Sequence, residues 1–141
     1  MRPMAEDPVP QPLPLSEPAS RALALSFETA IAAAFLRAEP GHREALEMLG
    51  HALTRQGKHD DALAVDRELV NLEPDNAYIR YNLACSLSNL GKVEDALREL
   101  ELALELGYDD VSYMQKDPDL ARVRKDPRYR RLLEKGKKGK G

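Results

Sequence analysis

The chain has 141 residues, of which 43% are hydrophobic and 32% charged, and its formal net charge is −3. This composition fits one helix-rich soluble domain, and the single cysteine, Cys85, excludes an intramolecular disulfide. The longest unbroken apolar run, residues 30–36, is too short to cross a bilayer, so we expect no transmembrane segment. The first residues also have no apolar core of a signal peptide, which favours a cytoplasmic, reducing setting.

The charges are unevenly distributed along the chain. Residues 116–141 hold 11 Lys and Arg against 4 Asp and Glu, a net charge of +7, whereas residues 1–115 carry −10. Such asymmetry marks either an interaction tail or simply a solvated chain end, and the sequence leaves both interpretations open.

Residues 1–19 contain six of the ten prolines. Each proline removes a backbone donor and fixes φ, so we expect a disordered or polyproline-like leader rather than a helix or strand.

The first predicted helix covers residues 20–38. Its apolar stripe runs through Leu23, Phe27, Ile31 and Phe35 at helical spacing. We expect this stripe to be uncovered and open to a second copy or a partner helix. Alternatively, three leader residues could fold over it: Val9, Leu13 and Leu15.

Two helix pairs follow, over 42–56 with 60–72 and over 76–90 with 93–106. Gly57 and Gly91 each separate the helices of one pair, and they lie 34 residues apart. Ala62 and Ala96 repeat at the same distance, so the sequence predicts two copies of one helix-turn-helix unit.

This pattern resembles the tetratricopeptide repeat family, in which small residues lie where paired helices approach closely. The matching small positions are Gly50 with Ala62 and Ala84 with Ala96. The resemblance implies an all-α, right-handed α-α superhelix of about seven helices. It places complete repeats at about 43–76 and 77–110 within a domain of residues 20–135. Helix 20–38 would then be the second helix of a unit whose first helix is missing.

The segment after the repeats predicts a cap, over residues 111–135. Asp117-Pro118 and Asp126-Pro127 each look like an N-cap followed by a first-turn proline, so short helices are expected near 118–124 and 127–135. The apolar residues that would cover the end of the stack are Leu120, Val123, Tyr129, Leu132 and Leu133. This segment also looks like a C-terminal extension behind some bacterial repeat arrays, and we expect residues 136–141 to be a basic flexible tail.

Catalytic and metal-binding patterns are missing from the sequence. It has no glycine-rich phosphate loop, and the three histidines, His42, His51 and His59, are not at ligand spacing. Cys85 has no neighbouring base and is expected to be a small packing or groove residue. We therefore predict no enzyme, no cofactor and no metal.

The resemblance implies instead a protein–protein adaptor whose first helices line a concave groove. The expected groove residues are Glu44, Glu47, His51, Thr54, Arg55, Tyr78, Tyr81, Asn82, Cys85, Ser88 and Asn89. Some family members clamp a terminal carboxylate, and Asn82 matches one of their positions. Glu47 and His51 stand where a Lys and an Asn are expected, which argues against such clamping. The acidic first half beside Tyr78 and Tyr81 suits a basic or mixed peptide better. An alternative function is attachment to an anionic partner, either nucleic acid or a membrane surface, through the basic C-terminal region, with nucleic acid disfavoured of the two.

Two charged residues, Asp66 and Arg80, occupy places where the repeat usually has an aromatic. Because they lie on neighbouring predicted helices, one hypothesis is that they form a buried ion pair. The alternative is that each side chain reaches water independently.

Overall fold

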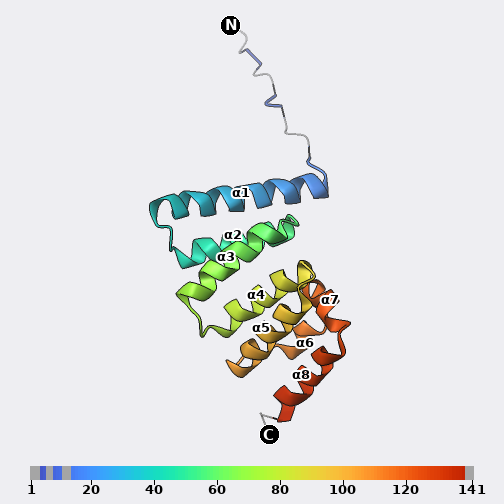
Figure 1. Ribbon diagram of the computed structural model, residues 1–141. Coiled ribbons are helices and arrows are strands. Elements are labelled where there is room, and N and C mark those ends of the chain that lie inside the picture. Colours follow the sequence, from blue (N-terminus) through green and yellow to red (C-terminus); the bar gives the residue numbers. More distant parts are fainter. Residues whose placement is uncertain (1–3, 6–7, 11–13, 139–141) are drawn as a thin grey trace.

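A computed structural model describes residues 4–5, 8–10 and 14–138, with the backbone alone for 137 and 138. The described chain is all-helical and contains no strand (Figure 1). Its elements are α1 (Glu17–Ala38), α2 (Arg43–Arg55), α3 (His59–Leu72), α4 (Ala77–Asn89), α5 (Val93–Glu105), α6 (Val111–Met114), the 3-10 helix η1 (Pro118–Leu120), α7 (Ala121–Arg124) and α8 (Pro127–Lys138). The all-α prediction is confirmed, although the described residues form more helices than expected.

Helix α1 begins three residues earlier than predicted. Ser16 caps it, since its side-chain oxygen accepts a hydrogen bond from the Ala19 amide at 3.3 Å. Pro18 fits in the first turn, where its missing N–H has no intrahelical partner to lose. The helix packs on α2 through the buried residues Leu25 and Ala32.

The two predicted helix pairs are α2 with α3 and α4 with α5. Gly57 and Gly91 have φ values of 75° and 76°, which glycine adopts without steric cost, so each ends its helix sharply. Ala62, Ala84 and Ala96 are fully buried, which allows the paired helices to approach closely. The 34-residue spacing therefore corresponds to one repeated structural unit.

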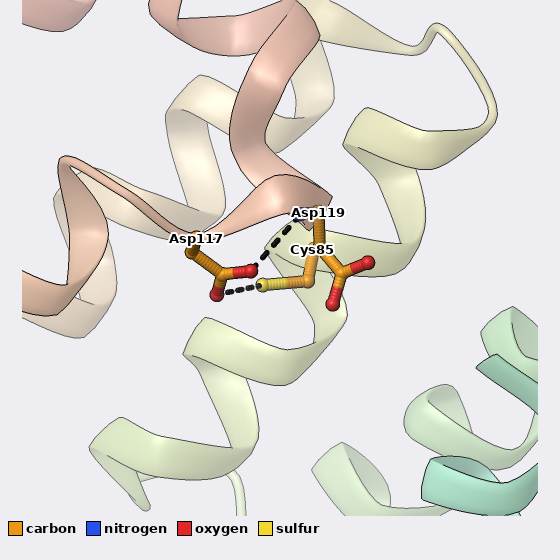
Figure 2. A group of neighbouring side chains, drawn as sticks. All are labelled: Cys85, Asp117 and Asp119. Atoms are coloured by element: carbon orange, nitrogen blue, oxygen red, sulfur yellow. Dashed lines mark hydrogen bonds between the residues drawn. The ribbon is translucent and has the colours of Figure 1, made fainter. Parts of the chain in front are cut away.

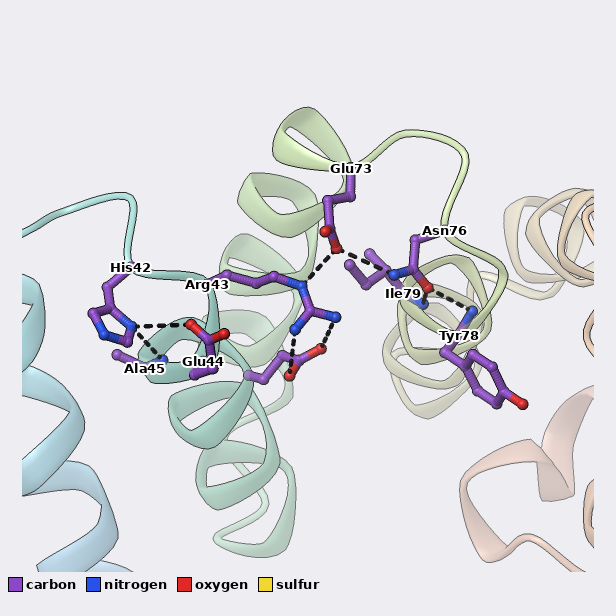
Figure 3. A network of polar contacts seen from close by, with 9 residues as sticks. His42, Arg43, Glu44, Ala45, Glu73, Asn76, Tyr78 and Ile79 are labelled. Carbon is purple, nitrogen blue, oxygen red and sulfur yellow. Dashed lines mark hydrogen bonds and ion pairs between the residues drawn. The ribbon is translucent and has the colours of Figure 1, made fainter.

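A polar network fastens the start of α2 to the turn between α3 and α4 (Figure 3). Arg43 lies 2.7 Å from Glu73 and 3.1 Å from Glu47. Glu73 also accepts a hydrogen bond from Asn76 at 3.1 Å, and Asn76 caps α4 by accepting from the amides of Tyr78 and Ile79. The hydrogen bond from Arg43 lowers the pKa of Glu73.

The C-terminal elements cover the end of the stack, as the sequence predicts. Leu120 and Val123 are fully buried in the same cluster as residues of α4 and α5. Tyr129 is also buried there, and Leu132 and Leu133 pack against the cluster. Helix α8 continues through residue 138, so 136–138 are helical rather than flexible, and residues 139–141 lie outside the described chain.

The predicted ion pair between Asp66 and Arg80 is wrong. Asp66 is buried and accepts a hydrogen bond from the Ser86 hydroxyl at 2.5 Å. Arg80 turns to α5, where it lies 3.2 Å from Glu99. It also donates to the carbonyl oxygen of Pro74 at 2.8 Å. The physical reason is register, because Asp66 faces the middle of α4 whereas Arg80 lies in its first turn.

Candidate functional site

A groove of about 310 Å³ lies between the first helices of the two repeats and the cap. Its lining residues are Glu47, Gly50, His51, Thr54 and Arg55 from α2, Asp66 and Leu69 from α3, Tyr81, Asn82 and Cys85 from α4, and Tyr113, Asp117 and Asp119 from the cap. Helices α2 and α4 thus contribute most of the surface, in the arrangement that the family resemblance implies.

Seven of the eleven predicted groove residues line this surface: Glu47, His51, Thr54, Arg55, Tyr81, Asn82 and Cys85. Glu44 and Tyr78 are exposed elsewhere, and Asn89 reaches the groove indirectly by donating to Asp119 at 3.1 Å. Ser88 is fully buried, so its predicted place in the groove is wrong. The error arises because α4 is enclosed on nearly all sides at this point.

The most important residues that the sequence analysis missed are carboxylates. Asp117 and Asp119 come from the cap, which folds back over α4, and Asp66 comes from a second helix of a pair. Asp117 was expected only as an N-cap, and its Oδ1 does accept from the Asp119 amide at 2.9 Å. The other oxygen, Oδ2, accepts from the Tyr81 hydroxyl at 2.5 Å.

Tyr81 supports the groove from inside and is not an exposed contact residue. Its ring stacks on Tyr108 with centroids 4.2 Å apart, and only 5% of its surface is exposed. Burial and the neighbouring Cys85 and Asp117 raise the pKa of Tyr81, so the phenol stays protonated and donates to Asp117. The contact therefore fixes the cap against α4.

Cys85, Asp117 and Asp119 bring one potential metal-ligand atom each within 4.8 Å of one another (Figure 2). Burial, followed by the neighbouring carboxylates, raises the pKa of the Cys85 thiol. The protonated sulfur lies 3.7 Å from Asp117 as a weak donor. In this structure hydrogen bonds join the cluster, since Asp117 accepts from the Cys85 thiol and from the Asp119 amide.

The groove carries an excess of negative charge. Asp66, Asp117 and Asp119 form no ion pair within the described residues, whereas Glu47 is paired with Arg43. Burial raises the pKa of Asp66 to about 6, against the weaker lowering effect of the Ser86 hydroxyl. Three carboxylates thus line one hollow, and none of them forms an ion pair with a lysine or arginine of the described chain.

A larger hollow of about 470 Å³ lies beside α5 and α8. None of the predicted groove residues lines this hollow. It is mainly bordered by apolar side chains such as Leu104, Val111 and Leu132. The predicted groove residues are therefore found at the smaller, polar groove and not at this apolar hollow.

One described helix, α1, is long and apolar enough to cross a membrane by length and composition alone. The expectation of no such segment considered only unbroken apolar runs. In the structure α1 is packed along α2, and Glu28 and Thr29 lie on its partly buried side. These features do not show a membrane span.

Stacked helix pairs with a polar groove on their first helices define a helical repeat protein of the solenoid class. Residues 53–116 match the family model described as tetratricopeptide repeat. The structure and this match therefore support tetratricopeptide repeats over residues 53–116, and such repeats generally mediate protein–protein interaction.

Two proteins of Arabidopsis thaliana are similar to the chain. One is described as a chloroplastic protein and is 33% identical over 88 residues, which cover 60% of this chain and 26% of that protein. The other, "TPR repeat-containing thioredoxin TTL4", is 32% identical over 84 residues, which cover 60% of this chain and 12% of that protein. The chain thus spans about a quarter or less of the length of these relatives.

Proposed function

We propose that the chain is a non-catalytic interaction module that binds an extended or helical segment of another protein in the groove. The observation that carries this proposal is the set of unpaired carboxylates, Asp66, Asp117 and Asp119, around one hollow. A lysine or arginine side chain entering there would form charge-assisted hydrogen bonds and offset the cost of the buried carboxylates.

The partner segment is therefore expected to be basic. His51, Thr54 and Asn82 supply adaptable polar contacts beside the acidic residues. Arg55 is the one arginine or lysine among the lining residues, so it could meet an acidic or carbonyl group of the same segment. This arrangement supports a basic or mixed peptide.

The alternative surface, the basic C-terminal region, is partly neutralised within the chain. Arg128 lies 3.0 Å from Glu94, and Lys135 lies 2.8 Å from Glu101. Both acidic residues belong to α5, so these cations hold α8 against the repeat. The groove is therefore the better-supported binding surface.

Selection of displayed random peptides against the full chain tests the proposal. We expect selected peptides to be enriched in lysine or arginine. Asp119→Asn should weaken a selected peptide about tenfold or more, equivalent to about 1.4 kcal/mol, in fluorescence polarisation. Asp75→Asn changes an exposed acid in the turn before α4 and should leave binding unchanged. Selection of mainly acidic peptides, or equal binding by all three proteins, would contradict the proposal.

A further inference from the structure

The outward side of α1 carries two parallel rows of exposed residues. The first row is bulky: Leu23, Phe27, Ile31 and Phe35 are 49%, 61%, 46% and 51% exposed. The second row is small: Ala22, Ser26, Ala30, Ala34 and Ala38 are all exposed. Each row follows the four-residue spacing of a helix surface, so a ridge lies beside a shallow furrow. We refer to these nine residues as the α1 strip.

Within the described chain, the α1 strip is contacted at one end, where the Phe35 ring lies 5.2 Å from the His42 ring, and its other large side chains are about half exposed. Helix α1 lies at the end of the stack, with α2 on its inner side (Figure 1). The leader residues Val9 and Leu15 are 81% and 56% exposed, so their predicted folding over the strip is not seen, and Leu13 lies outside the described residues.

The α1 strip is also uncharged. Between residues 22 and 36 the single charged residue is Glu28, which turns to Arg55 of α2 at 3.8 Å. An uncharged apolar surface has nothing to attract nucleic acid or an anionic membrane surface. Its complement must be another uncharged apolar surface.

We propose that the α1 strip binds a second copy of this chain, with the two α1 helices crossing in a two-fold symmetric dimer. Ridge and furrow belong to the same helix, so a two-fold axis places the ridge of each copy in the furrow of the other. Interlocking four-residue rows is the commonest form of helix packing, at a crossing angle of about −50°. Each copy of the strip therefore provides both the ridge and the furrow that the symmetric interface needs.

The available area fits such a dimer. Four large side chains that are about half exposed, together with five small residues, offer at most roughly 600 Å² on each copy. Complete burial on both copies would give about 1,200 Å², the lower end of the range for specific interfaces, and crossed helices bury less than this and so form a weak interface. We therefore expect a reversible dimer with a micromolar dissociation constant.

A membrane is a weaker occupant of the α1 strip. To cross a bilayer, α1 would have to leave α2, exposing Leu25 and Ala32 and carrying Glu28 into lipid. The furrow of small residues would also give a lipid surface less apolar area than a uniformly bulky face. A two-fold dimer uses both rows without disturbing α2.

Sedimentation velocity of the full chain across about 1–100 µM tests the proposal. We expect a monomer–dimer equilibrium for the wild type, and we expect Phe27→Glu to be monomeric throughout this range. The circular dichroism spectrum of Phe27→Glu should be unchanged, because the Phe27 ring is mostly exposed and its replacement should not disturb the fold. Leu72→Glu is the matched control: Leu72 is 49% exposed at the end of α3 and lies outside the strip, so dimerisation should persist. A wild-type chain that stays monomeric, or a dimer that survives Phe27→Glu, overturns the proposal.

Filling the furrow distinguishes a second copy from a lipid surface. Ala30→Phe adds apolar area but removes the space for the partner's ridge, so the dissociation constant should rise at least tenfold. Flotation with neutral phosphatidylcholine vesicles should show no binding by either protein. Vesicle binding that strengthens in Ala30→Phe and disappears in Phe27→Glu would overturn the proposal in favour of a membrane.

Discussion

At the scale of single residues, Asp66 is the feature with the clearest energetic consequence. It is a buried carboxylate whose one polar contact from a side chain in the described chain is the Ser86 hydroxyl. A Cβ added at Gly50 would lie 3.4 Å from Asp66 Oδ1, an ordinary van der Waals contact, so the carboxylate lies directly against this part of α2. The sequence identified Asp66 as unusual, but periodicity does not fix the axial register of neighbouring helices closely enough to distinguish Ser86 from Arg80 as its partner.

Asp66→Asn should remove a pH dependence of stability. The pKa of Asp66 in the folded chain is raised to about 6, so this group binds its proton more tightly when folded. The contribution of Asp66 to the free energy of unfolding is therefore fully present below its ordinary pKa of about 4. It is lost as the pH rises through 6. The difference between a pKa of about 6 when folded and about 4 when unfolded corresponds to roughly 3 kcal/mol.

Urea unfolding at pH 4, 6 and 8 measures this effect. Asn can still accept from Ser86, so Asp66→Asn should match the wild type near pH 4 and become more stable than it by about 1–3 kcal/mol at pH 8. Parallel stability curves for the two proteins would show that the carboxylate is not held protonated.

At the scale of elements, the cap both closes the core and completes the groove. The sequence predicted its apolar contacts because Asp-Pro pairs mark helix starts, but it missed α6, since four residues are too few to show a period. It also missed the cap's place in the groove. That contribution depends on contacts such as Tyr81 with Asp117, which are 36 residues apart and follow from tertiary folding.

Leu120→Ala tests the structural role of the cap. Leu120 is fully buried, so its truncation should lower the free energy of unfolding by about 2–5 kcal/mol through lost burial and a residual cavity. Leu72→Ala, at a half-exposed position, should cost less than about 1 kcal/mol. Thermal or urea unfolding followed by circular dichroism measures both. Equal, small losses would mean that the cap is not cooperatively packed.

At the scale of the whole molecule, the groove and the α1 strip are separate sets of residues. The groove uses α2, α3, α4 and the cap, whereas the strip uses the outer side of α1, so the proposed dimer would carry two available grooves. Two linked sites slow dissociation from a surface that displays many copies of a ligand, without changing the affinity of one site.

A selected basic peptide can be used to test this coupling between the two proposals. In solution, wild type and Phe27→Glu should bind the free peptide with the same dissociation constant, because Phe27 does not line the groove. On a densely coated sensor surface, the wild type at a concentration where it is dimeric should dissociate at least about tenfold more slowly than Phe27→Glu. At low peptide density the two proteins should again be equal, since neighbouring peptides are then too far apart to be bridged.

A difference in the solution affinity would instead mean that the strip and the groove are energetically coupled within one chain. Equal dissociation at high density would mean that the dimer does not present both grooves to one surface.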